Sequence, residues 1–287
     1  MKIPEYITET ALDQLIDLAL KEDIGDGDHT TMAVLPERAE NKAKMVVKAN
    51  GVIAGIYVAE KIYRKLQEDA ELVFHVRDGE EMNEGDLIMT ISGKARTLLT
   101  GERLALNFMQ RMSGIATYTN RLVKLLEGTP AKILDTRKTT PGMRMLEKWA
   151  VKIGGGENHR FGLYDMILLK DNHIDFAGGI SNAIQAVQHY LQDTNKNLKI
   201  EVETRSLQEV QEVLRTGGVD VIMLDNMDLD TMKKAVSLIN GKYKTEASGG
   251  VNETTIREIA FCGVDYISVG ALTHSVKSLD ISLLAYK

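Results

Sequence analysis

The stretch KIEVETRSLQEVQEVLRTGGVDVIMLD, residues 199–225, holds two apolar runs on either side of a helical pattern. The runs KIEVE (199–203) and VIMLD (221–225) have the length and the β-branched content of strands. Residues 206–215 between them have the apolar spacing of a helix. Continuous apolar strands that alternate with helices are typical of a parallel sheet covered by helices. The stretch therefore predicts one compact βα unit of an α/β protein.

Similar units recur on both sides of this stretch. Further strand-like runs occupy residues 131–136, 166–170, 244–250 and 266–270, and further helical patterns occupy 181–191, 228–239 and 253–261. The last four of the six runs are spaced about 22 residues apart, the length of one compact βα unit. Even, short spacing favours a closed barrel, with an open sheet as the alternative. The sequence after Pro130 thus predicts an α/β barrel or sheet.

The first hundred residues have a different pattern. Residues 7–21 have one apolar helical face, and 98–126 form a long helical pattern interrupted at Ser113-Gly114. Between them, residues 42–58, 71–77 and 86–92 contain β-branched runs broken by glycines, which predict short antiparallel strands. We expect an α+β region here.

Composition excludes several classes of function. The 287 residues include 35 basic and 41 acidic side chains, so the net charge of −6 disfavours general binding to nucleic acid or anionic membranes. No run approaches 18 apolar residues, and the start of the chain lacks the pattern of a signal peptide. Cys262 is the only cysteine, which fits a reducing compartment. We therefore expect a cytoplasmic protein with no membrane span.

The two commonest nucleotide-binding motifs are also missing, since the chain has neither GxGxxG nor GxxxxGK. In a parallel barrel, however, ligands bind at the carboxyl ends of the strands. Those ends carry Arg137, Lys138, Thr139, Lys170, Asp171, Asn172, His173, Glu201, Glu203, Asp225, Asn226, Ser248, Gly249, Gly250, Gly270 and His274, and the segment between the first two runs adds His159 and Arg160.

These residues fall into three chemical groups. The cations and histidines suit carboxylate or phosphate groups. Glu203 and Asp225 suit a magnesium ion or sugar hydroxyls. The SGG and VGA turns present backbone N–H groups that suit a phosphate monoester. Any one such cation is more often a solvated surface charge, but all six strands end in members of the same set.

Several longer motifs resemble the quinolinate phosphoribosyltransferase family. They are ALKEDIGDGDHTT (19–31), GERLALNFMQRMSGIAT (101–117), DTRKTTPGMR (135–144), GGGENHRFGLYD (154–165), LLKDNH (168–173), IEVE (200–203), MLDN (223–226), ASGGV (247–251) and ISVGALTHS (267–275). The resemblance covers essentially the whole chain in order. It implies an incomplete, open α/β barrel over 113–275 and an N-terminal α+β sandwich over 1–112 that is joined by the C-terminal segment 276–287.

The resemblance also implies an activity and its residues. The family transfers a phosphoribosyl group from phosphoribosyl pyrophosphate (PRPP) to quinolinate with Mg²⁺ and loss of CO2, at an active site shared in a homodimer. Carried over by motif, Arg137, Arg160 and Lys170 hold the carboxylates of quinolinate with His159 and Thr139 nearby, and Arg103 reaches in from the partner subunit. Lys138 faces the pyrophosphate, Glu203 and Asp225 hold the ribose and the metal, and Ser248, Gly249, Gly250, Gly270 and His274 cradle the 5-phosphate. Lys138, Lys170, Glu203 and Asp225 are the expected catalytic residues.

Some alternatives stay open at this stage. Glu201 competes with Glu203 for the ribose and metal, since the IEVE motif offers two glutamates. Three rival functions are a phosphoribosyltransferase for a monocarboxylate, a Schiff-base aldolase or decarboxylase through Lys170, and a sugar-phosphate sensor. A dicarboxylate substrate explains the number of cations better than a monocarboxylate does.

Overall fold

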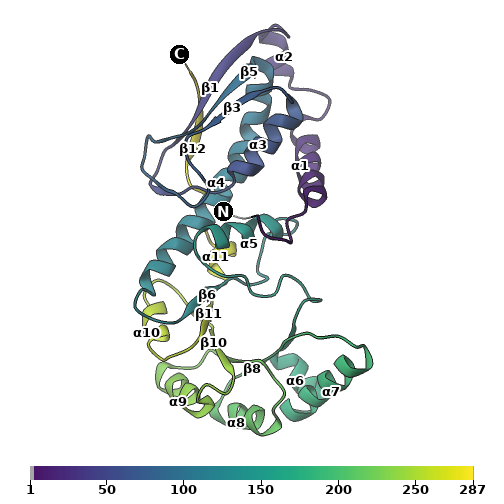
Figure 1. Cartoon of the computed structure of the whole chain (residues 1–287), viewed down its shortest axis with the longest axis vertical. Coiled ribbons are helices and arrows are strands. Elements are labelled where there is room, and N and C mark those ends of the chain that lie inside the picture. The colour runs from purple at the N-terminus through teal and green to yellow at the C-terminus, as the bar shows by residue number, and fades with distance from the viewer. Residues whose placement is uncertain (1–2, 287) are drawn as a thin grey trace. The chain divides into compact units, whose positions relative to one another are not determined.

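The computed structural model describes residues 3–286, which form two compact units (Figure 1). The first unit contains residues up to Asn120 together with Thr139–Gly155 and the segment from Ser275 onward. The second contains Arg121–Lys138 and Gly156–His274. Each unit is described separately below.

The first unit is built on an antiparallel sheet with the strand order β12-β1-β5-β3. Its strands are β1 (Glu40–Val47), β3 (Glu71–Phe74), β5 (Leu87–Lys94) and β12 (Ile281–Ala285), and β2 (Gly51–Val52) pairs separately with β4 (Glu81–Met82). The helices that belong wholly to this unit are α1 (Glu9–Ile24), α2 (His29–Val34), α3 (Ile56–Leu66) and α5 (Arg144–Ile153). α3 lies beside the sheet, and α1 lies beyond α3 (Figure 1). The pairing of β12 with β1 joins the C-terminal segment to this unit.

Two sequence predictions fail in this unit. Residues 56–58 were predicted as the end of a strand, but they begin α3. The backbone N–H of Ile56 donates to Asp78 Oδ1 at 3.0 Å, so a side chain 22 residues away caps this helix. Its apolar positions, Ile56, Ala59, Ile62 and Tyr63, follow helical spacing and are buried.

The second failed prediction is the interruption at Ser113-Gly114, because α4 (Ala95–Leu125) is continuous. Ser113 Oγ accepts from the N–H of Ala54 at 2.9 Å and donates to the carbonyl oxygen of Ala54. A Cβ at Gly114 would lie 2.3 Å from the carbonyl oxygen of Lys277. The two residues therefore allow close packing of the backbone and do not break the helix.

The second unit is a six-stranded sheet with the order β6-β11-β10-β9-β8-β7, and every pairing in it is parallel. The strands are β6 (Lys132–Leu134), β7 (Ile167–Leu169), β8 (Ile200–Thr204), β9 (Val221–Asp225), β10 (Lys244–Ser248) and β11 (Tyr266–Ser268). All six predicted strands are confirmed, although β6, β10 and β11 end two residues earlier than predicted. β6 and β7 lie at the two edges and are not paired with each other, so the barrel is open, as the family resemblance implied. The closed barrel that the even spacing of the runs favoured is wrong, because within residues 3–286 the sheet lacks the strands that would join its two edges.

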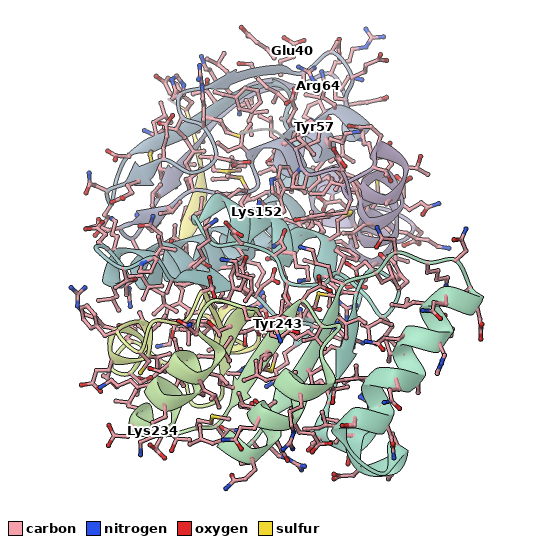
Figure 2. The ribbon with its side chains drawn as sticks, turned by 60° about the horizontal axis from the view of Figure 1, so that its bottom comes forward. Glu40, Tyr57, Arg64, Lys152, Lys234 and Tyr243 are labelled. Atoms are coloured by element: carbon pink, nitrogen blue, oxygen red, sulfur yellow. The ribbon has the colours of Figure 1, made fainter. Side chains whose placement is uncertain are left out.

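The helices of this unit follow the strands, as predicted. They are α6 (Asp171–Ala177), α7 (Ile180–Asp193), α8 (Leu207–Thr216), α9 (Leu229–Ile239), α10 (Ile256–Ala260) and α11 (Ala271–His274). α8 packs against α7, α9 and β8. Figure 2 labels the exposed Lys234 on α9, whose apolar face is formed by Met232, Ala235 and Ile239. Because all six strands are parallel, their carboxyl ends lie at one edge of the sheet. The helices that follow the strands cover the outer side of this sheet (Figure 1).

No helix among residues 3–286 combines the length and the apolar character needed to cross a membrane. The predicted division at residues 112 and 113 falls inside α4, and the compact units divide the chain at other places. Domain boundaries at 1–112 and 113–275 stay a prediction.

Candidate active site

A cavity of about 820 Å³ opens at the carboxyl ends of the six parallel strands. Its wall is formed entirely by residues of the second unit. It contains every residue predicted for the substrate except Arg103 and Thr139: Arg137, Lys138, His159, Arg160, Lys170, Glu203, Asp225, Ser248, Gly249, Gly250, Gly270 and His274. The parallel sheet thus gathers residues that are up to 137 positions apart, from Arg137 to His274, around one space.

The end of β6 is fixed by hydrogen bonds before the chain reaches its two cations. The fully buried Asp135 accepts from the backbone N–H of His159 at 2.9 Å and from Asn158 Nδ2 at 2.6 Å. Thr273 Oγ1 donates to the carbonyl oxygen of Lys138 at 2.8 Å. The backbone around Arg137 and Lys138 is therefore held from two directions.

Arg137 and Arg160 are two neighbouring cations in the cavity wall. Burial, followed by the nearby charge of Arg137, lowers the pKa of Arg160. Arg160 Nη1 donates to the carbonyl oxygen of Met166 at 3.3 Å, whereas Arg137 Nε is buried without a hydrogen-bond partner. A buried donor without an acceptor is costly, and two adjacent cations repel. An anion in the cavity would relieve both costs.

Lys170 lies at the end of β7 and begins α6. Its backbone N–H donates to His173 Nδ1 at 3.0 Å, so His173 fixes the turn that brings the Lys170 side chain into the cavity wall. His173 was among the predicted strand-end residues, and it acts here on the backbone of Lys170.

Glu203 and Asp225 form the acidic part of the cavity. Burial first, and then the charge of Asp225, raises the pKa of Glu203. Asn226 Nδ2 donates to Asp225 Oδ2 at 2.7 Å, which holds this carboxylate at the strand end. Two repelling carboxylates with hard oxygen atoms fit a Mg²⁺ ion, which prefers such ligands and would neutralise them.

The turn after β10 needs small residues. Gly249 has φ +97°, and a Cβ there would lie 2.1 Å from Asn226 Oδ1. A Cβ at Gly270 would lie 3.0 Å from Lys138 Cδ and 3.2 Å from His274. Both glycines therefore keep backbone accessible at the cavity wall, which fits the close approach of a phosphate group.

His159 meets two buried glutamates, Glu201 and Glu246, at the wall of this cavity. His159 Nε2 lies 2.8 Å from Glu201 Oε2 and 3.5 Å from Glu246 Oε2, and each glutamate is 1% exposed. Burial raises the pKa of both carboxyl groups. Of the two glutamates in IEVE, Glu203 lines the cavity and Glu201 contacts His159.

Glu246 was missed from sequence. It also lines the cavity, and it stands two residues before Ser248 on the same face of β10. A glutamate in a strand that is buried on both faces is the signal that could have identified it.

Comparisons with known proteins decide the family. Residues 28–113 match the model of the quinolinate phosphoribosyl transferase N-terminal domain, and residues 115–284 match that of the C-terminal domain. The chain belongs to the quinolinate phosphoribosyltransferase family.

Individual relatives agree over nearly the full length. The chain is 46% identical to "Quinolinate phosphoribosyltransferase [decarboxylating] 1b" of Nicotiana tabacum over 284 residues, which is 94% of this chain and 81% of that protein. It is 44% identical to a "Probable nicotinate-nucleotide pyrophosphorylase [carboxylating]" of Bacillus subtilis, with 95% and 92% of the two chains covered. The crystal structure of NadC from Streptococcus pyogenes matches with a TM-score of 0.92 at 40% identity, over 98% of this chain and 99% of that one.

Two residues that the family motifs named lie outside the cavity wall. Arg103 is exposed on α4, and Thr139 Oγ1 accepts from Arg144 Nε at 3.0 Å. Both belong to the first compact unit. Their roles toward the substrate stay predictions.

Proposed function

We propose that this chain transfers the phosphoribosyl group of PRPP to quinolinate and releases CO2, giving nicotinate mononucleotide and pyrophosphate for de novo NAD biosynthesis. The family membership and the names of the relatives support this reaction. The observation that carries it at the site is the pair Arg137 and Arg160, two neighbouring cations of which one has a buried donor without an acceptor. A pyridine dicarboxylate supplies two anions for such a pair.

We assign the cationic side of the cavity to the two anionic groups that react or leave. Arg137, Arg160 and Lys170 hold the carboxylates of quinolinate, since a guanidinium binds a carboxylate with two parallel N–H groups. Lys138 faces the pyrophosphate of PRPP as a point charge. His159 lies in the wall beside the pyridine.

We assign the acidic side to the ribose and to magnesium. Glu203 and Asp225 would hold the ribose hydroxyls and a Mg²⁺ ion, which when bound would neutralise charge on the departing pyrophosphate. Ser248, Gly249, Gly250, Gly270 and His274 would surround the 5-phosphate. In this arrangement the anionic ring and the sugar are held on opposite sides of the bond that forms.

The reaction then needs positioning more than a protein nucleophile. The bond between the ribose carbon and pyrophosphate breaks, and that carbon becomes similar to an oxocarbenium ion. The arginines hold the carboxylates of quinolinate and so orient its ring. The pyridine nitrogen then attacks the ribose carbon from the opposite face and becomes positive. The bond from the ring carbon to the 2-carboxylate breaks, CO2 leaves, and the positive nitrogen stabilises the electron pair that stays on that carbon. A proton then adds to this carbon and gives nicotinate mononucleotide. The chain contributes orientation and preorganised charge to each step.

We further propose a homodimer, or a higher homo-oligomer, in which Arg103 completes the site of the partner subunit. The family resemblance and the exposed position of Arg103 on α4 support this role. Mixing two inactive variants, Arg103→Ala and Asp225→Ala, tests it. Activity returns in the mixture if sites are shared, and an inactive mixture of folded variants contradicts sharing.

We also propose that the reaction takes place in the cytoplasm, as the single cysteine suggests. The direct test of the function is an assay of the purified chain with quinolinate, PRPP and Mg²⁺. Nicotinate mononucleotide should form only when all three are present. Its formation from nicotinate alone with PRPP, with no use of quinolinate, would contradict the proposal.

A further inference from the structure

Three polar side chains cluster at the wall of the cavity, and two of them, the glutamates, have no part in the proposed reaction. The three are His159, Glu201 on β8 and Glu246 on β10, and their nearest polar atoms all lie within 4.8 Å of one another. The side chain of His159 is 9% exposed, and those of the two glutamates are 1% and 2% exposed. The sequence alone indicates no role for Glu246 and leaves Glu201 as a candidate for the ribose and the metal.

This cluster is costly for an ordinary protein core. Glu201 Oε1 and Glu246 Oε1 are both buried without a hydrogen-bond partner. Carboxyl groups buried in this way destabilise a fold unless other groups compensate. Apolar side chains of similar volume would fill these positions of the two strands at lower cost. The cluster therefore calls for a function that needs its polar atoms.

The arrangement of the cluster points to one member as its target. Both glutamates face the same atom, His159 Nε2, at 2.8 and 3.5 Å. The backbone of His159 is held separately, since its N–H donates to the buried Asp135 at 2.9 Å. The backbone and the ring of His159 are thus fixed by three different acidic residues, and the ring lies in the cavity wall.

The two glutamates differ in their contact with the ring. Glu201 Oε2 is within hydrogen-bond distance of His159 Nε2, whereas Glu246 Oε2 lies 3.5 Å from the same atom. Burial, followed by the charge of Glu201, raises the pKa of Glu246. Glu201 is therefore the direct partner of the ring, and Glu246 supports it from β10.

We propose that Glu201 and Glu246 are positioning residues that hold the His159 imidazole through Nε2, so that the ring keeps one orientation in the wall of the substrate cavity. The inference rests on the proposed function, in which His159 lies beside the pyridine dicarboxylate. Glu201 and Glu246 would then affect the binding of the pyridine substrate and not that of PRPP. Neither glutamate needs to touch the substrate.

The kinetic test compares Glu246→Ala with Glu246→Gln, and uses Thr245→Ala as the matched control. Thr245 is the preceding buried polar residue of β10, but it hydrogen-bonds Asp265 and does not line the cavity. We expect Glu246→Ala to raise KM for quinolinate roughly threefold to tenfold, the usual effect of losing one neutral polar contact, while KM for PRPP stays within about twofold. Glu246→Gln should restore most of the difference. Thr245→Ala should lower the melting temperature and change neither KM.

A spectroscopic test needs no turnover. In His-labelled protein, the ring nitrogens of His159, assigned from a His159→Gln variant, should show a protonated Nε2 in the wild type and in Glu246→Gln. The combined Glu201→Ala and Glu246→Ala variant should show averaged ring signals. If that variant does not fold, Glu201→Gln with Glu246→Gln replaces it and should shift the Nε2 signal.

The outcomes separate this inference from the proposed function. A wild type that forms no product contradicts the function, and the ring signals of His159 then decide the positioning role alone. An active wild type with equal changes of both KM values in Glu246→Ala, or with unchanged ring signals in the combined variant, overturns the positioning role and leaves the function intact.

Discussion

The two sides of the cavity differ in the sign of their charge, and they do not neutralise each other. The cationic side consists of Arg137, Lys138, Arg160 and Lys170, and the acidic side consists of Glu203 and Asp225. Within residues 3–286, no salt bridge joins one side to the other.

Both sides carry an electrostatic cost. The pKa of Arg160 is lowered and that of Glu203 is raised, in each case first by burial and then by a like charge nearby. Charges that stay apart in this way are available for a ligand that has anions at one end and hydroxyl groups or a metal at the other. The cavity is therefore organised for a ligand with two different parts.

The largest change in substrate binding is expected when a cation of the cavity is removed. Arg137→Ala or Arg160→Ala should raise KM for quinolinate by at least about thirtyfold, because losing one charge-assisted pair costs roughly 2–5 kcal/mol. KM for PRPP should change far less. Steady-state kinetics with each substrate varied in turn measures both values.

Arg121→Ala is the matched control for this prediction. Arg121 is an exposed arginine of the same unit that pairs with Glu253 at 3.1 Å, so its loss should leave both KM values unchanged. Unchanged quinolinate KM in both cavity variants would contradict the assignment of the cationic side.

The acidic side should respond in the opposite way. Asp225→Ala should raise KM for PRPP and the Mg²⁺ concentration needed for half-maximal rate by roughly tenfold to a hundredfold, the range usual for groups around a metal. Asp228→Ala is the control, since Asp228 caps α9 three residues later and lies outside the cavity wall. Titration of the rate with Mg²⁺ distinguishes them. Normal magnesium dependence in Asp225→Ala would remove this residue from the acidic side.

A smaller change in rate is expected for a residue that holds the backbone of the cationic side without touching the substrate. Thr273→Val removes the donor to the carbonyl oxygen of Lys138 but keeps the shape of the side chain. We expect kcat to fall about threefold to tenfold, because one neutral hydrogen bond contributes about 1 kcal/mol. Thr273→Ser should recover most of the rate. Equal rates in Val and Ser variants would show that Lys138 is held by other contacts.

The smallest change in turnover is expected for Glu246→Gln. This variant should instead change how the free energy of unfolding depends on pH. Burial and the charge of Glu201 raise the pKa of Glu246 to about 8 from its ordinary 4.5. The folded state therefore keeps a proton that the unfolded chain loses, and the stability of the wild type falls as the pH rises from about 5 to about 8.

Glutamine carries no such proton. The free energy of unfolding of Glu246→Gln minus that of the wild type should therefore be larger at pH 8 than at pH 5, by about 1 kcal/mol or more. Urea unfolding at both pH values measures this difference. A difference that stays constant with pH, or moves in favour of the wild type, would show that Glu246 is not held protonated in the fold.

The sequence predicts the second unit better than the first, and the reason is physical. Each parallel strand is buried on both faces, so its apolar run is continuous and is visible without knowledge of its neighbours. In the first unit, by contrast, α3 begins where distant Asp78 caps Ile56, and α4 passes through Ser113-Gly114 because Ala54 and Lys277 pack there. Such long-range contacts leave no local signal.

The candidate site shows the same limit. Arg137, Lys170 and Asp225 follow recognisable strands, so the rule that ligands bind at strand ends was enough to gather them. Glu246 lies within a strand, and only the packed barrel brings it next to His159. Arg103 was named by resemblance alone, and the strand-end rule that named Thr139 did not place it in the cavity wall.

The most direct test of the two-sided cavity is the ratio of kcat/KM for quinolinate to that for nicotinate, each with saturating PRPP and Mg²⁺. The ratio should strongly favour quinolinate. When quinolinate carries a label in its 2-carboxylate, one labelled CO2 should be released for each nicotinate mononucleotide formed. A preference for nicotinate, or product formation from quinolinate without CO2, would contradict a cavity whose cationic side is built for a dicarboxylate.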